Sequence, residues 1–152
     1  GGVMALATLL AEVRTILLTV SGISPLVYTR ERWASQASAV RSLYVTKGRL
    51  HAWTITRQSS TENRLATGHE NERRHTLVIR GYYALDDEAD SETTFQALIE
   101  GICTTFRVLP NLNAQVATSE PIQVELVEPR MFCETLCHYA ELRLETLELL
   151  IW

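Results

Sequence analysis

The chain has 152 residues, of which 46% are hydrophobic and 21% are charged. This length predicts a single domain over residues 1–152 that buries a core, and the balance excludes a wholly disordered chain. The net charge of −4 argues against a domain whose main task is to bind nucleic acid, because such domains are usually basic. The apolar stretch over residues 3–20 contains Glu12 and Arg14, so we expect no membrane span. Three cysteines, an odd number, fit a reducing compartment better than a disulfide framework.

Hydrophobic periodicity predicts two helices. Apolar residues recur at steps of three and four within residues 4–20, which predicts a helix there. Gly22 suits the left-handed position that follows such a helix. The same spacing from Phe95 to Phe106 predicts a helix over residues 90–108, with acidic residues at its start. Residues 34–47 combine weak helical spacing with several serines, so we expect an irregular or partly helical crossing.

Alternating apolar and polar residues predict strands over residues 26–33, 50–56, 75–83, 122–131 and 136–147. The polar residues 58–73 predict either a long mobile loop or the extended tip of a hairpin whose flanking strands pair. The chain ends in an apolar Leu-Leu-Ile-Trp, which we expect to pack on its own sheet or on a neighbouring subunit.

This order of elements predicts an α+β domain. We expect a mixed or antiparallel sheet of four to five strands, with two helices packed on one face and a long loop in one β-hairpin.

Metal and catalytic motifs are sparse. Cys133, Cys137 and His138 form a C-x3-C-H pattern, but we expect a hairpin there, and a structural zinc site needs a fourth ligand. We therefore expect no metal and no cofactor. His51 and His75 are placed to face each other across paired strands. Such a pair has two interpretations: the histidines take part in acid–base catalysis, or they are ordinary residues on the sheet surface.

The remaining motifs have structural explanations. Asp86, Asp87, Glu88 and Asp90 lack the spacing of a calcium loop and fit an acidic turn that caps a helix. The serines show no G-x-S-x-G motif and no convincing Ser-His-Asp order, and the glycines form no phosphate-binding loop. We therefore expect no enzyme.

Arginines and aromatic residues recur together along the chain. Thirteen of the fourteen basic residues are arginine, and arginine, tryptophan, tyrosine and methionine are enriched in the cores of protein interfaces. Together with the polar segment and the apolar end, these clusters favour a subunit of an assembly. The candidate interface residues are Arg30, Arg32, Trp33, Arg57, Arg64, His69, Arg73, Arg74, Arg130, Met131, Phe132 and Trp152.

Several stretches carry a resemblance to a known family. Residues 49–57, 75–87, 95–106, 127–132 and 137–142, together with the order of elements, resemble the tail terminator proteins of tailed bacteriophages, including the lambda type. The resemblance covers most of the chain and contains no catalytic motif.

The resemblance implies a structural virion protein at the head-proximal end of a phage tail, assembled in the host cytoplasm. Such proteins form a hexameric ring on the last ring of the tail tube protein and stop tube growth at the tape-measure length. They also present a joining surface to the head–neck connector and leave a lumen through which DNA passes without specific binding. The alternatives are a neck or tail-completion protein of the same phage, or a small α+β enzyme or ligand-binding domain.

Overall fold

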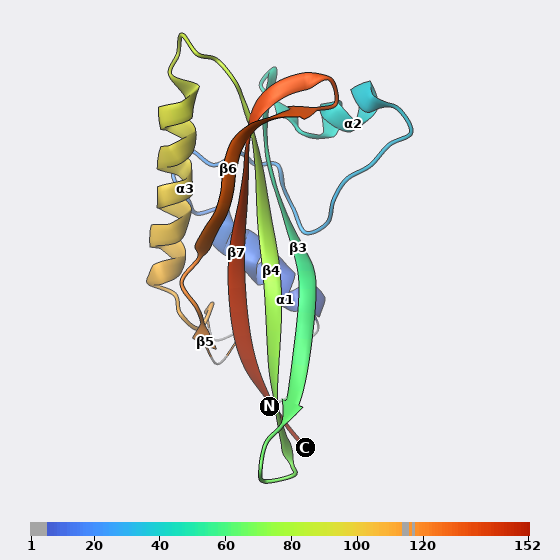
Figure 1. Ribbon diagram of the computed structural model, residues 1–152, viewed down its shortest axis with the longest axis vertical. Helices are drawn as coiled ribbons and strands as arrows, with labels where there is room; N and C mark the ends of the chain where they lie inside the picture. Colours follow the sequence, from blue (N-terminus) through green and yellow to red (C-terminus); the bar gives the residue numbers. More distant parts are fainter. Residues whose placement is uncertain (1–5, 114–115, 117) are drawn as a thin grey trace.

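The computed structural model describes residues 6–113, 116 and 118–152, and Figure 1 shows how they fold. The order of elements confirms the α+β class. The described helices are α1 (Leu6–Leu17), α2 (Ala37–Leu43) and α3 (Ser91–Arg107). The strands are β1 (Val27–Tyr28), β2 (Val45–Thr46), β3 (Arg49–Arg64), β4 (Glu70–Ala84), β5 (Thr118–Ser119), β6 (Gln123–Phe132) and β7 (Thr135–Ile151).

The sheet is mixed and larger than expected. Its main path runs β1-β3-β4-β7-β5, with β2 pairing with β3 and β6 pairing with β7. β1 is parallel to β3, and the other pairs are antiparallel. The expected four to five strands and two helices therefore become seven strands and three helices in the described residues. Strands β1, β2 and β5 have two residues each, which is too short for a hydrophobic period to show.

The strand expected over residues 26–33 is wrong beyond Tyr28. The backbone N–H of Arg32 donates to the hydroxyl of Tyr44 at 3.1 Å, and that hydroxyl donates back to the Arg32 carbonyl at 3.3 Å. These bonds hold the chain against the end of α2 rather than along the sheet edge. The helix expected over 4–20 ends at Leu17, and residues 4 and 5 lie outside the described residues.

Residues 58–73 form the extended tip of a hairpin. β3 and β4 pair from His51 with Tyr83 to Arg64 with Asn71, which confirms the hairpin tip, one of the two alternatives; the long mobile loop is wrong, because only residues 65–69 form the turn. The chain's apolar end continues β7 alongside β4, from Ala84 with Cys137 to Glu70 with Ile151. The backbone of the chain's end thus pairs with its own sheet, but the side chains of Leu149, Ile151 and Trp152 stay exposed rather than packing on it.

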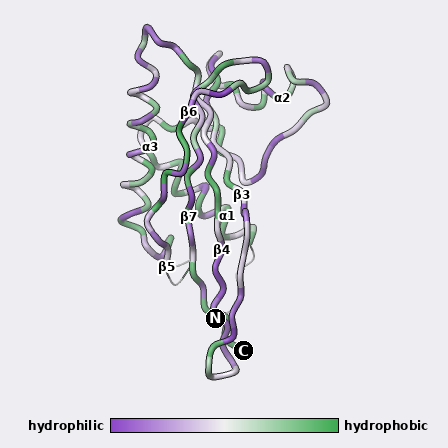
Figure 2. The backbone as a smooth tube through the Cα atoms, in the orientation of Figure 1, coloured by the Kyte–Doolittle hydropathy of each residue, from purple (hydrophilic) through white to green (hydrophobic). Residues whose placement is uncertain are grey.

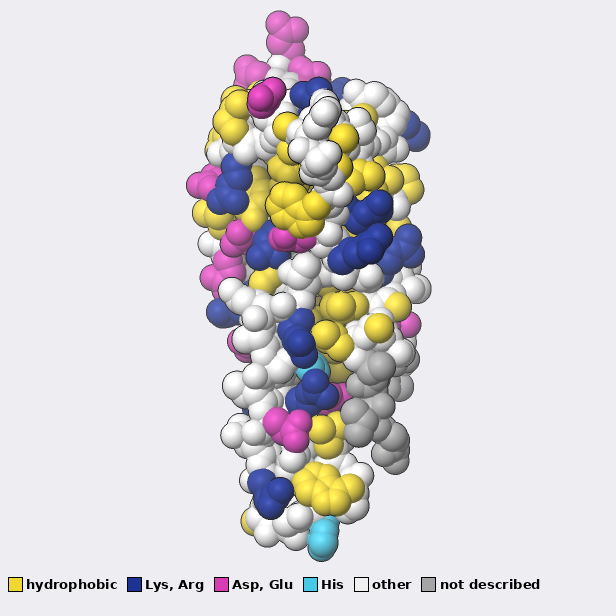
Figure 3. Space-filling view, turned by 90° about the vertical axis from the view of Figure 1, so that its right-hand side faces the viewer, with side chains coloured by type: hydrophobic (Ala, Val, Ile, Leu, Met, Phe, Trp, Pro, Cys, Tyr) yellow, Lys and Arg dark blue, Asp and Glu magenta, His cyan; other side chains and the backbone are white. Residues whose placement is uncertain are grey.

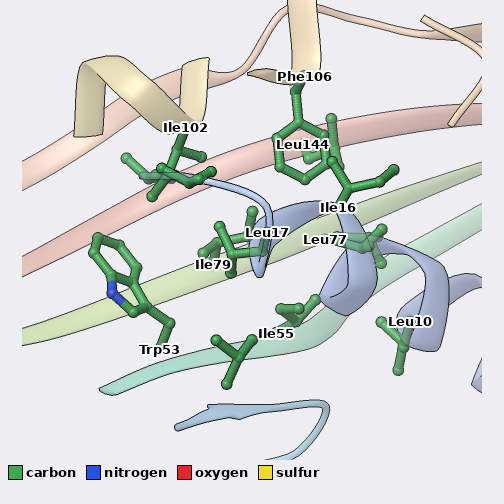
Figure 4. Packing of buried hydrophobic residues seen from close by; sticks show 14 of the residues in the cluster. Leu10, Ile16, Leu17, Trp53, Ile55, Leu77, Ile79, Ile102, Phe106 and Leu144 are labelled. Atoms are coloured by element: carbon green, nitrogen blue, oxygen red, sulfur yellow. The ribbon is translucent and has the colours of Figure 1, made fainter. Parts of the chain in front are cut away.

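Two hydrophobic clusters lie on opposite faces of this sheet. α1 and α3 cover one face, where the larger cluster joins them to β3, β4 and β7; Figure 4 shows its centre around Trp53, Ile55, Ile79 and Leu144. The smaller cluster includes Tyr44, Tyr82 and Tyr139, with α2 and the β6–β7 hairpin around it. The far ends of β3, β4 and β7 project beyond the helices, and Figure 2 shows hydrophilic residues along much of that projection. None of the described helices is long and apolar enough to cross a membrane.

The indole of Trp53 occupies space that glycine leaves on β4. Gly81 is the cross-strand partner of Trp53, and a Cβ atom at Gly81 would lie 2.6 Å from Trp53 Cε3. Trp53 has no exposed surface, and its ring stacks on Phe95 of α3 at 5.8 Å between centroids. The missing side chain at Gly81 therefore lets α3 dock on the sheet.

We expect Gly81→Ala to destabilise the protein by about 1–3 kcal/mol, because the added methyl group overpacks a buried indole. Gly48→Ala is the matched control: nothing lies within 4 Å of its added Cβ, so only its positive φ of 75° opposes the change, at about 1 kcal/mol. Urea unfolding of both variants measures the difference. Equal losses in the two variants would contradict the packing argument.

Candidate functional site

The projecting end of the sheet gathers several of the predicted interface residues. We define the tip as residues 62–73 of the β3–β4 hairpin together with residues 148–152. The backbone N–H of Trp152 donates to the carbonyl of His69 at 3.0 Å, and the guanidinium carbon of Arg64 lies 5.8 Å from the centroid of the Trp152 ring. The structure thus brings Trp152 next to Arg64 and His69, from which it is separated by more than 80 positions in the sequence.

The tip exposes apolar surface. Leu149 is 48% exposed, and Ile151 and Trp152 are each 60% exposed. Because side chains alternate along a strand, Leu149 and Ile151 point to the same face of β7. A large aromatic ring, aliphatic side chains and a neighbouring arginine form the composition that is typical of the energetic centre of a protein interface.

Two other predicted arginines, Arg73 in the tip and Arg74 beside it, form ion pairs within the sheet. Arg73 Nη1 lies 3.7 Å from Glu148 Oε1, and Arg74 Nε lies 2.7 Å from Glu72 Oε1. Their strand positions are adjacent, so they point to opposite faces of β4. The Arg73–Glu148 pair joins β4 to β7 and supports their register, whereas Arg74 and Glu72 lie on the same strand.

Another group of predicted residues lies at the opposite end of the sheet. Met131 at the end of β6 is 62% exposed, and the guanidinium carbon of Arg130 lies 3.9 Å from the centroid of the Tyr139 ring. Phe132 packs at 4.9 Å from Tyr44 and at 4.6 Å from Tyr82, between ring centroids, so most of it belongs to the smaller hydrophobic cluster.

The remaining predicted residues, Arg30, Arg32, Trp33 and Arg57, lie along the β3 edge. Trp33 is 73% exposed, and Arg32 covers the Tyr28 ring at 4.9 Å. Figure 3 looks onto this edge and shows Lys and Arg side chains gathered near its middle. The predicted set therefore forms several separate surfaces rather than one site.

The cysteine pattern lies at a hairpin, as expected, and does not converge. Cys133 and Glu134 form the two-residue β6–β7 turn, both with positive φ, while Cys137 and His138 point to opposite faces of β7. Burial raises the pKa of the Cys137 thiol to about 11, which disfavours the thiolate that a metal needs. Among the described residues, no three His, Cys, Asp or Glu side chains are placed to hold a metal ion.

The expectation that His51 and His75 face each other is wrong. His51 pairs with Tyr83, whereas His75 pairs with Ser60 further along the hairpin. His51 Nε2 accepts a hydrogen bond from the indole N–H of Trp53 at 3.2 Å, and burial lowers the pKa of His51 to about 4. This histidine is a neutral acceptor that serves the core.

The structure does form one arrangement that sequence reasoning missed. Ser60 Oγ lies 2.5 Å from His75 Nδ1, and His75 Nε2 lies 3.4 Å from Glu148 Oε1, which is the order of a nucleophile, a base and a carboxylate. The cavity beside His75 is about 140 Å³, and Ser59, Thr61 and Arg74 line it, whereas Ser60 does not. A hydrolase needs a substrate pocket at its nucleophile, so the geometry favours a structural role. Only the strand register, which no local motif reports, places these three residues together.

The acidic turn caps a helix, as expected. The side chain of Asp90 accepts a hydrogen bond from the backbone N–H of Thr93 at 3.4 Å, and Asp86 accepts one from Ala89. Asp86 also lies 3.3 Å from Arg49.

Ser91 and His138 form a buried pair behind this turn. Ser91 Oγ accepts the backbone N–H of Asp86 at 2.8 Å and lies at hydrogen-bond distance, 2.7 Å, from His138 Nε2. The His138 ring stacks on Phe95 at 5.6 Å, which joins this pair to the packing of α3 on the sheet.

Comparison with protein-family models finds no match, and comparison with curated proteins finds no similar sequence. The candidate surfaces therefore stand on geometry and composition.

We expect the free energy of unfolding to fall as the pH drops from about 6.5 toward 4. The folded pKa of His51 is about 4, below its ordinary 6.5, so the unfolded chain binds the proton first and acid favours unfolding. His51→Gln keeps an acceptor for Trp53 without a titrating group and should flatten the pH dependence. Urea unfolding at several pH values measures this slope, and an unchanged slope in the variant would contradict the assignment.

The pKa of His75 is also lowered, chiefly by burial and then by the charge of Arg73, so its contribution to acid unfolding has the same sign. His75→Gln, measured in the same series, separates the two contributions.

Proposed function

We propose that this chain is a structural virion protein of a tailed bacteriophage. It forms a hexameric ring that caps the tail tube, ends tail polymerisation and offers a joining surface to the head–neck connector. The observation that supports this proposal is the tip: a three-stranded projection that carries Leu149, Ile151 and Trp152 away from both hydrophobic clusters and leaves them exposed.

The projection has the reach that contact with a second ring needs. Residues 57–64 of β3 alone span about 23 Å at roughly 3.3 Å per residue. This segment pairs with β4, and β4 pairs in turn with β7, so the sheet supports the projection and its apolar end as one unit. A surface of this kind, costly to leave in water, fits a protein whose partner is always present in the finished particle.

The negative net charge of the chain supports a ring lumen through which DNA passes without binding. Binding of duplex DNA grows with the number of phosphates that lysine and arginine neutralise, and a chain of net charge −4 has few basic residues to spare for that.

Electron microscopy of lysates from infections in which this gene carries an early stop codon tests the proposal. Abnormally long tails without heads are expected, because nothing would end tube growth. Tails of normal length that fail to join heads would move the assignment to a neck or tail-completion protein. Normal infectious particles would contradict both assignments.

Shortening the tip should separate folding from assembly. We replace residues 62–73 with Asn-Gly, so that Thr61 and Arg74 flank a two-residue turn, and end the chain after Leu147. Neither hydrophobic cluster contains a removed residue, so the domain should still fold and unfold cooperatively in urea. Supplied in place of the native protein, it should fail to cap tails.

A second variant keeps the tip's length and removes only its apolar surface: Leu149→Thr, Ile151→Thr and Trp152→Ser. It should also fail to cap tails while unfolding at about the same urea concentration as the native chain. Normal capping by either variant would remove the tip from the function.

A further inference from the structure

The β3 edge of the sheet carries a basic surface. A shallow depression beside β3 is lined by Arg30, Arg57 and Arg80, with Glu31 as its acidic residue. Arg80 is engaged, since it lies 3.6 Å from Glu31 and donates to Thr56 at 2.8 Å. Arg30 and Arg57 are exposed, and no acidic side chain among the described residues lies within ion-pair distance of them. We call this surface the basic edge.

The other side of the sheet carries an acidic pocket. A cavity of about 210 Å³ lies between the start of α3 and β6, and its lining includes Asp87, Asp90, Glu92 and Glu128 but no lysine or arginine. His138, nine-tenths buried, lines it as well. Asp87 and Glu92 are exposed and take part in no ion pair among the described residues.

These two surfaces lie at opposite edges of one sheet. Figure 1 shows α3 and β6 on one side of the molecule and β3 on the other. β3, β4, β7 and β6 are successively antiparallel, so β3 and β6 also run in opposite directions. Rotation about an axis that runs along the strands leaves the strand directions unchanged. If neighbouring copies are related by such a rotation, β6 of one copy is antiparallel to β3 of the next.

The two surfaces differ in height along the strands. Glu128 on β6 pairs with Tyr139 on β7, Tyr139 pairs with Tyr82 on β4, and Tyr82 pairs with Ala52 on β3. Glu128 and Ala52 therefore lie at the same height along the strands. Arg57 lies five residues further along β3 than Ala52. At roughly 3.4 Å per residue the stagger is about 17 Å. If the strands tilt relative to the axis of a closed ring, the basic edge of one copy and the acidic pocket of the next come to the same height along that axis. Strands tilt in this way in β-barrels.

We propose that copies of this chain bind head to tail, with Arg30 and Arg57 of one copy seated against the Asp87 and Glu92 carboxylates of the next. The occupant is a second copy because the chain supplies both halves of a charge-complementary contact on opposite edges. Such a contact joins two different patches, so it repeats from copy to copy and closes into a ring when the rotation allows. The inference deepens the proposed ring function and rests on it.

Reversing the charge of one edge tests the contact in the purified full-length chain. Arg30→Glu with Arg57→Glu makes all four side chains of the proposed contact acidic, and Asp87→Arg with Glu92→Arg makes all four basic. Sedimentation velocity at low salt should show the native chain as an oligomer and each variant with roughly tenfold or more weaker self-association. An equal mixture of the two variants should assemble again, because acidic and basic copies then alternate.

The control changes the net charge equally, away from both surfaces. Lys47→Glu with Arg107→Glu also shifts the charge by −4, since each substitution replaces +1 with −1, and both residues are exposed. This variant should assemble like the native chain. The proposal is overturned if the control also dissociates, if an edge variant still assembles alone, if the mixture stays monomeric, or if the native chain is a monomer at its highest soluble concentration.

The outcome is separable from that of the proposed function. An edge variant that still assembles and still yields tails of normal length refutes this contact and leaves the terminator assignment standing. Normal tails in the complete absence of the gene product refute the assignment, whatever the sedimentation shows.

Discussion

The pairing of β4 with β7 is the constraint on which the rest of the structure depends. The two strands stay in register from Ala84 with Cys137 at one end to Glu70 with Ile151 at the other. One face of this ladder supplies the sheet side of the larger hydrophobic cluster, and the other face supplies Tyr82 and Tyr139 to the smaller one. Beyond both clusters the same ladder continues into the tip. A single run of non-local hydrogen bonds thus links the packed body to the exposed end.

Because side chains alternate along a strand, β4 packs against different elements on the two faces of the sheet. On β4, Gly81 leaves room for Trp53 and so admits α3, while its neighbours Arg80 and Tyr82 face the opposite side. Tyr82 joins the aromatic cluster under α2, and Arg80 reaches Glu31 in the connection after β1. Adjacent residues of one strand therefore fix α3 on one face, and α2 with the arginine-rich connection on the other.

The tip and the sheet edges present different kinds of surface, and this difference organises the proposed assembly. At the tip, Trp152 and Ile151 expose apolar area that gains stability only when a partner covers it. At the edges, charged side chains dominate, and such contacts depend on salt and favour specific orientation over raw affinity. Apolar contact along the tail axis and charged contact around the ring would give one chain two independent interfaces.

The sequence by itself determined the α+β class, a helix over about residues 90–108 with an acidic turn at its start, the pairing of the strands that flank residues 58–73, and the hairpin at Cys133. Each of these depends on residues close together in the chain, where period, capping and turn chemistry are local. Only the tertiary structure decided that residues 58–64 are a strand, because their polar side chains carry no strand signal and β7, which continues the sheet beside β4, lies some 80 residues away. It alone joined Ser60, His75 and Glu148, and it divided the predicted interface residues among the tip, the β3 edge and the far end of β6. Register between distant strands sets these positions, and register follows from burial summed over the whole sheet rather than from any short stretch of sequence.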